Sequence, residues 1–137
     1  MASPAVRSIA AVVVGVLMAV LVIAVVEMAG HLVFPPPPGL DVTDPADQAK
    51  LMDEIPLPAM IAVVVAWFLG SLAGASTAIA IAHRILPAWS VALVIAAMGL
   101  WTTQMFPHPG WMIVSAMVLP LVAVLVAKRV MAEKLTG

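Results

Sequence analysis

The sequence predicts an all-α membrane protein, a four-transmembrane-helix bundle. Three observations support this prediction. Hydrophobic residues make up 64% of the 137 residues and charged residues only 9%, whereas a soluble domain is roughly half apolar. Four long, nearly uncharged runs each approach the ~20 residues that a helix needs to cross a bilayer. The basic residues gather at alternate ends of these runs. Because the runs and their connections fill the sequence, we expect one transmembrane domain over residues 1–137.

The first spanning helix is predicted over residues 8–31. No charged residue interrupts the apolar run from Ser8 to Val26, and Pro35 follows the run, where proline stops a helix. A cleavable signal peptide is the alternative, but its apolar core would be only about 7–15 residues long and a small-residue cleavage site would follow it. We therefore expect an uncleaved first helix.

A Pro-rich outer loop is predicted over residues 34–56, between the first two spans. It opens with four consecutive prolines, which favour a stiff polyproline II segment. Thr43 or Asp44 can cap a short helix that begins at Pro45 and ends before Pro56. One side of that helix is apolar, so we expect it to lie on the membrane surface or over the bundle.

The remaining spans are predicted over residues 57–82, 85–106 and 111–127. Arg84 marks the end of the second span, and a proline-rich turn closes the third. Pro120 lies inside the fourth span, where we expect a kink.

The distribution of charge predicts the orientation of the bundle. One side of the four spans carries Arg7, Arg84, Lys128, Arg129 and Lys134, while Lys50 falls on the other side together with the six acidic residues from Glu27 to Glu54. Basic residues favour the cytoplasmic side of a membrane. We therefore expect both termini in the cytoplasm (N-in/C-in), in the cytoplasmic (inner) membrane if the protein is bacterial.

Composition excludes several kinds of chemistry. Six Lys and Arg residues are too few to build the basic face that binds nucleic acid. The absence of Cys removes disulfides and thiolate sites. His31 and His108 each follow a Met by three residues, a ligand pair that suits Cu(I), but Met is also a common gap-filler in apolar cores. We expect no metal, haem or other cofactor.

A stripe of small residues in the second span includes Gly70 and Gly74, four residues apart. Small side chains let two helices approach closely in a membrane. The stripe is predicted to serve helix packing, and two interpretations stay open. It packs inside the bundle, or it contacts a second copy or a larger membrane-protein partner.

Polar residues gather at the predicted outer ends of the first and third spans. Glu27 and His31 share one helix face because they are four residues apart, and ionisable residues in a span are functional candidates. The alternative is an interfacial hydrogen-bonded pair that anchors the helix end. The candidate outer polar site comprises Glu27, His31, Asp41, Trp101, Gln104 and His108.

Three classes of function are compatible with these features. The main prediction is a small structural, accessory or partner-binding subunit, because no special chemistry is evident. The alternative is a small proton-linked transporter or ligand-binding protein with its site at the extracytoplasmic ends of the first and third spans. A membrane-embedded enzyme ranks last, because the chain lacks a nucleophile elbow, an HExxH motif and a phosphate-binding loop.

Overall fold

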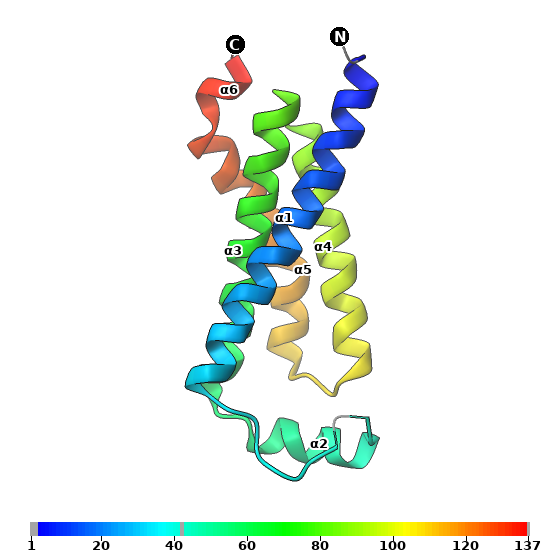
Figure 1. The fold of residues 1–137 in the computed structure, drawn as a ribbon, viewed down its shortest axis with the longest axis vertical. Helices are drawn as coiled ribbons and strands as arrows, with labels where there is room; N and C mark the ends of the chain where they lie inside the picture. The colour runs from blue at the N-terminus through cyan, green and yellow to red at the C-terminus, as the bar shows by residue number, and fades with distance from the viewer. Residues whose placement is uncertain (1–2, 42, 137) are drawn as a thin grey trace.

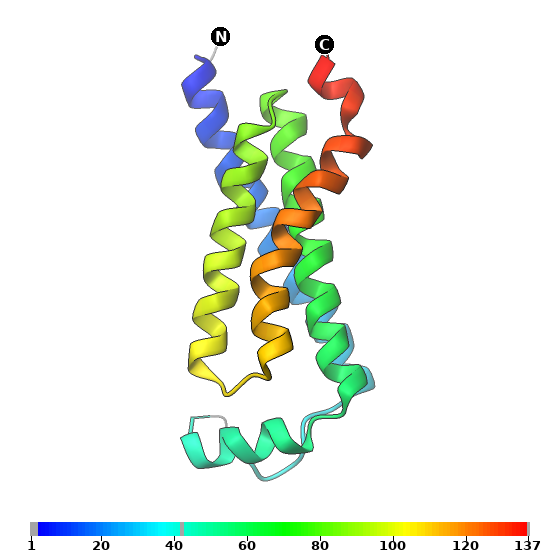
Figure 2. The same ribbon diagram turned by 180° about the vertical axis from the view of Figure 1, so that it is seen from behind.

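The computed structural model describes residues 3–41 and 43–136, which form helices joined by turns with no strand among them. The helices are α1 (Pro4–Val33), α2 (Pro45–Glu54), α3 (Leu57–Ala82), α4 (Leu86–Met105), α5 (Gly110–Val130) and α6 (Ala132–Thr136). Four of them, α1, α3, α4 and α5, are long and apolar enough to span a membrane, and they stand together as a bundle (Figures 1 and 2). The predicted fold class is confirmed to this extent.

The two ends of the bundle differ in what they carry. The chain begins and ends at one of them, which we call the termini end (Figure 1). At the other, the loop end, α4 turns into α5 and α2 lies across the direction of the long helices (Figures 1 and 2).

Charged residues end the apolar runs without ending the helices. α1 begins at Pro4 and not at residue 8, because the Ser3 hydroxyl accepts a hydrogen bond from the Val6 amide and caps it. α5 continues to Val130, three residues beyond the expected span over residues 111–127. Cations in its last turn complement the negative end of the helix dipole.

Small residues bring α1 and α3 into close contact. A Cβ added to Gly74 would lie 2.5 Å from the Gly15 carbonyl oxygen, and one added to Gly70 would lie 2.7 Å from the Ala19 carbonyl oxygen. The two backbones therefore approach each other as small-residue stripes allow. Atoms of α1 lie against Gly70 and Gly74, so the stripe packs inside the bundle in this structure, the first of its two interpretations.

The surface of the bundle is strongly apolar. Large side chains such as Leu17, Leu21 and Leu125 are 65%, 58% and 53% exposed. Exposed apolar area on this scale is unfavourable in water but suits helices surrounded by lipid.

α2 stands apart from the spanning helices. No Cα of α2 comes within 8 Å of a Cα in another helix of the described chain. Its order comes from local bonds, since the Asp44 carboxylate accepts from the Ala46 amide at 2.9 Å and the Asp47 carboxylate accepts from the Asp41 amide at 3.1 Å.

Candidate functional site

Glu27 places a carboxylate inside a spanning helix. It lies six residues before α1 ends at Val33, so about 9 Å of helix separates it from that end. Its side chain is half-buried and lies near the Trp67 side chain of α3 and near His31 one turn later. A carboxylate in apolar surroundings needs such partners, because an unpaired charge there is costly.

Trp67 connects Glu27 to the turn between α4 and α5. Its side chain is 6% exposed and packs with Met112 and Ala116 of α5. The His108 ring centroid lies 6.4 Å from that of Trp67, and His108 Nδ1 lies 3.0 Å from the Phe106 carbonyl oxygen. The structure therefore brings Glu27 and His108 close to the same buried indole.

Trp67 is not among the site residues predicted from the sequence. One signal could have found it, because Trp67 lies ten residues into α3, away from the helix ends where interfacial tryptophans gather. A tryptophan that far inside a span has an N–H that needs a partner, which points to the nearest polar side chain.

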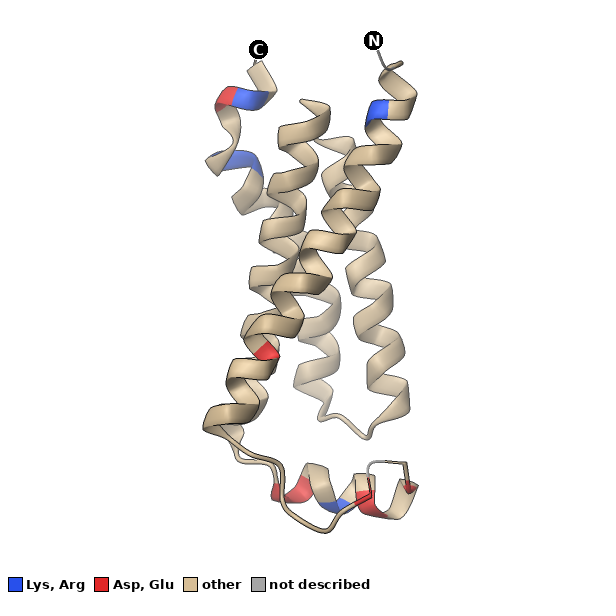
Figure 3. Cartoon of the chain, in the orientation of Figure 1, with Lys and Arg blue, Asp and Glu red and all other residues tan. Residues whose placement is uncertain are grey.

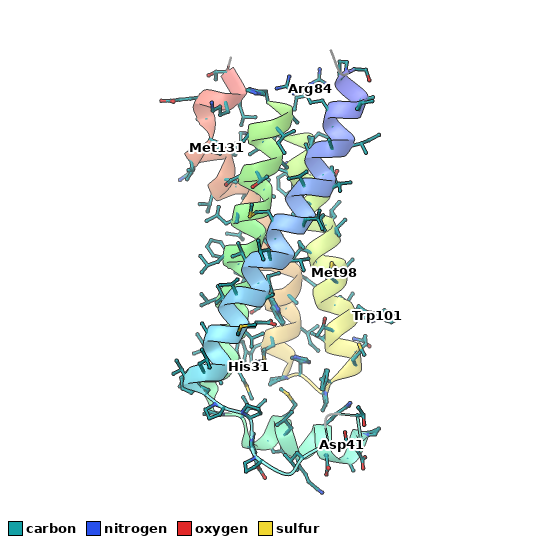
Figure 4. The ribbon with its side chains drawn as sticks, in the orientation of Figure 1. His31, Asp41, Arg84, Met98, Trp101 and Met131 are labelled. Atoms are coloured by element: carbon teal, nitrogen blue, oxygen red, sulfur yellow. The ribbon has the colours of Figure 1, made fainter. Side chains whose placement is uncertain are left out.

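The six residues of the predicted outer site do not form one cluster. His31, Asp41 and Trp101 lie well apart at the loop end (Figure 4). Trp101 is 72% exposed, whereas Thr103, two residues later, is 5% exposed. Residues two apart lie on nearly opposite faces of a helix, so Trp101 faces away from the bundle. Gln104 is exposed as well.

Asp41 is exposed and organises the loop. Its Oδ1 accepts hydrogen bonds from the Thr43 hydroxyl at 2.7 Å and the Thr43 amide at 2.8 Å. These two bonds hold the pKa of Asp41 below its usual value. The pKa of Asp47 is likewise lowered, by the Asp41 amide and by Lys50, whose Nζ lies 3.1 Å from Asp47 Oδ1.

Ser71 carries the one buried side-chain oxygen or nitrogen in the described chain that lacks a hydrogen-bond partner. Thr77 on the same helix shows the usual alternative, since its hydroxyl donates to the Ala73 carbonyl at 2.8 Å. Ser71 is fully buried one turn after Trp67. An unpartnered hydroxyl in a helical core costs roughly 1–3 kcal/mol.

The chemistry at the loop end is sparse. No group of three His, Asp or Glu side chains in the described ranges could hold a metal ion together. Two surface depressions involve other residues, one between α1 and α4 at the termini end and one on α4 around Met98 and Trp101. What Glu27, Trp67 and His108 offer is a half-buried carboxylate and an imidazole close to the same buried indole.

Comparison of the chain with family models, with curated protein sequences and with solved structures finds no significant match.

Proposed function

We propose that this protein is a non-enzymatic, partner-binding subunit of the cytoplasmic membrane, oriented with both termini in the cytoplasm and α2 on the outer side. The division of charge supports this orientation. Lys and Arg residues cluster at the termini end, whereas the loop end is predominantly acidic (Figure 3). Positive charge is retained on the cytoplasmic side of membranes.

The observation that carries the proposal is the isolation of α2. The helix has ten residues, and helices this short are marginal without tertiary packing. No Cα of another described helix lies within 8 Å of α2, and its apolar side chains Leu51 and Met52, with Ile55 just after its end, are only half-buried. A binding partner would cover them and stabilise the helix.

The charge of the loop favours a protein partner over the membrane surface. Residues 34–56 contain five carboxylates and one ammonium group, whereas helices that bind membrane surfaces are typically rich in Lys and Arg. The acidic loop would be repelled by anionic headgroups and attracted by a basic protein surface. The partner is therefore a protein whose extracytoplasmic surface is basic and partly apolar.

Site-specific photo-crosslinking in native membranes tests this proposal. A crosslinking amino acid replaces Ala49, which is exposed on α2, and a control crosslinker replaces Leu17, which is exposed on the spanning part of α1. We expect one protein adduct from position 49 and lipid adducts from position 17. Charge reversal by Asp53→Lys with Glu54→Lys should remove the protein adduct, while Glu133→Lys at the termini end should leave it unchanged. Lipid adducts alone at position 49, or a protein adduct that survives the α2 charge reversal, would contradict the proposal.

Glu27 supports a second candidate, proton-linked binding of a ligand. A carboxylate beside an indole and an imidazole inside a span is the kind of group that couples protonation to binding. This function requires that Glu27→Gln abolish proton uptake or release when a ligand is added. A ligand that binds equally well to the Gln variant, without any pH dependence, would remove the candidate.

A further inference from the structure

A groove opens between α1 and α4 at the termini end of the bundle. Its walls are apolar, with Ile9, Val12 and Val13 from α1 facing Leu86 and Pro87 from α4, and its volume is about 340 Å³. Because α1 and α4 are both spanning helices, the groove faces the region that lipid occupies.

Arg84 lies at the end of this groove. It belongs to the turn between α3 and α4, next to the start of α1 (Figure 4). No hydrogen bond or ion pair engages its guanidinium among the described residues. Arg7 differs, because its Nε donates to the Ile81 carbonyl oxygen at 2.6 Å. Arg84 therefore keeps its donors available for an external acceptor.

We infer that this groove binds an anionic phospholipid, with an acyl chain along the apolar walls and the phosphate on Arg84. Guanidinium groups bind phosphate oxygens through paired, charge-assisted hydrogen bonds. The apolar walls lead into the span and the cation lies where the helices leave it, so the groove matches both parts of a lipid. Basic pockets between spanning helices bind anionic headgroups in this way.

Charge also selects among lipids. Arg7 lies near the start of α1, Arg84 in the turn between α3 and α4, and Lys128 and Arg129 in the last turn of α5. These segments lie at the termini end, where few acidic residues are found (Figure 3). A net negative headgroup is attracted there, whereas the quaternary ammonium of phosphatidylcholine offsets the charge of its own phosphate. Phosphatidylglycerol is therefore expected to bind more tightly than phosphatidylcholine with the same acyl chains.

Native mass spectrometry of the purified full chain in mild detergent measures this preference directly. The probes are dioleoyl-phosphatidylglycerol and dioleoyl-phosphatidylcholine, added in separate titrations. Arg84→Gln should weaken phosphatidylglycerol binding about fivefold or more and reduce the difference between the two lipids. Arg129→Gln is the matched control, because it removes a cation from the same end without touching the groove, and it should leave the affinity nearly unchanged.

A second variant tests the groove independently of the charge. Val13 is 53% exposed, so Val13→Trp would place a large ring in the groove without disturbing the core. We expect this variant to lose binding of the first phosphatidylglycerol molecule while keeping its helical circular dichroism. Equal affinity for both lipids in the unmodified protein, an equal loss in Arg129→Gln, or unchanged binding in Val13→Trp would each overturn the inference.

Discussion

The contact between α1 and α3 can be tested by adding one methyl group to Gly74. A Cβ at this position would lie 2.5 Å from the Gly15 carbonyl oxygen, 2.8 Å from the Ala19 Cβ and 3.1 Å from a Val91 methyl. The nearest of these atoms is backbone and cannot rotate away. Gly74→Ala therefore forces α1 and α3 apart along the contact.

The expected cost follows from two opposing effects. Overpacking of a tight contact typically costs about 1–3 kcal/mol, while replacing Gly by Ala within a helix gains up to about 1 kcal/mol. Gly30→Ala on α1 is the matched control, since its new Cβ would lie 3.8 Å from the Ala62 Cβ, an ordinary contact. We expect Gly74→Ala to lower the free energy of unfolding by about 1–2 kcal/mol, and Gly30→Ala to leave it equal or slightly higher.

Titration with sodium dodecyl sulfate from mild detergent micelles, followed by circular dichroism and tryptophan fluorescence, gives the free energies of unfolding. The comparison of two identical chemical changes removes the shared effect of helix propensity. If Gly74→Ala and Gly30→Ala unfold at the same detergent fraction, α1 does not pack on α3 as the structure has it.

Three further predictions concern the polar groups. Ser71→Ala should leave the free energy of unfolding unchanged or raise it by up to about 1 kcal/mol, because it removes an unpartnered hydroxyl. A decrease of more than about 1 kcal/mol in the same titration would mean that the hydroxyl has a partner. Trp67→Phe should destabilise the protein more when residue 27 is Glu than when it is Gln. A double-mutant cycle should give a coupling free energy of about 0.5 kcal/mol or more between the two positions. Additive effects of the two substitutions would refute the contact between Glu27 and Trp67. The carboxyls of Asp41 and Asp47 should titrate below their ordinary value of 3.8, so the loop keeps its structure above that pH and loses these bonds as the pH falls through the lowered pKa values. Carbon-13 NMR of the two carboxyls measures the midpoints, and midpoints at or above 3.8 would contradict the assignment.

The spanning helices could be predicted from the sequence because lipid imposes a strong and local constraint. A segment must be apolar over about 20 residues and must satisfy its own backbone hydrogen bonds. α3, which runs from Leu57 to Ala82, coincides with the predicted span over residues 57–82. The predicted ends differ from the structure at α1 and α5. Capping by Ser3 extends α1 before its apolar run, and Lys128 and Arg129 complement the helix dipole where α5 continues past its own.

The candidate site was harder to predict, because it depends on which helix faces meet. Spacing alone places Glu27 and His31 on one face, but only the packing of α1 on α3 brings Trp67 to the carboxylate. Trp101 shows the converse. It was predicted to belong to the outer polar site, yet the face of α4 that packs inward is the one that carries Thr103. Residues two positions apart lie on nearly opposite faces of a helix, so one can be buried in the bundle while the other faces lipid.

The small-residue stripe stabilises the bundle, whereas the proposed partner contact involves α2. α1 packs against Gly70 and Gly74, so a contact within the chain covers the small-residue surface that could otherwise contact a second copy. No Cα of another described helix lies within 8 Å of α2, so a change in the packing of α1 on α3 does not act on α2 directly. Gly74→Ala should therefore weaken the bundle while leaving the crosslink from position 49 in place, as long as the protein remains folded. Loss of that crosslink in a folded Gly74→Ala protein would show that the partner contacts the bundle as well as α2.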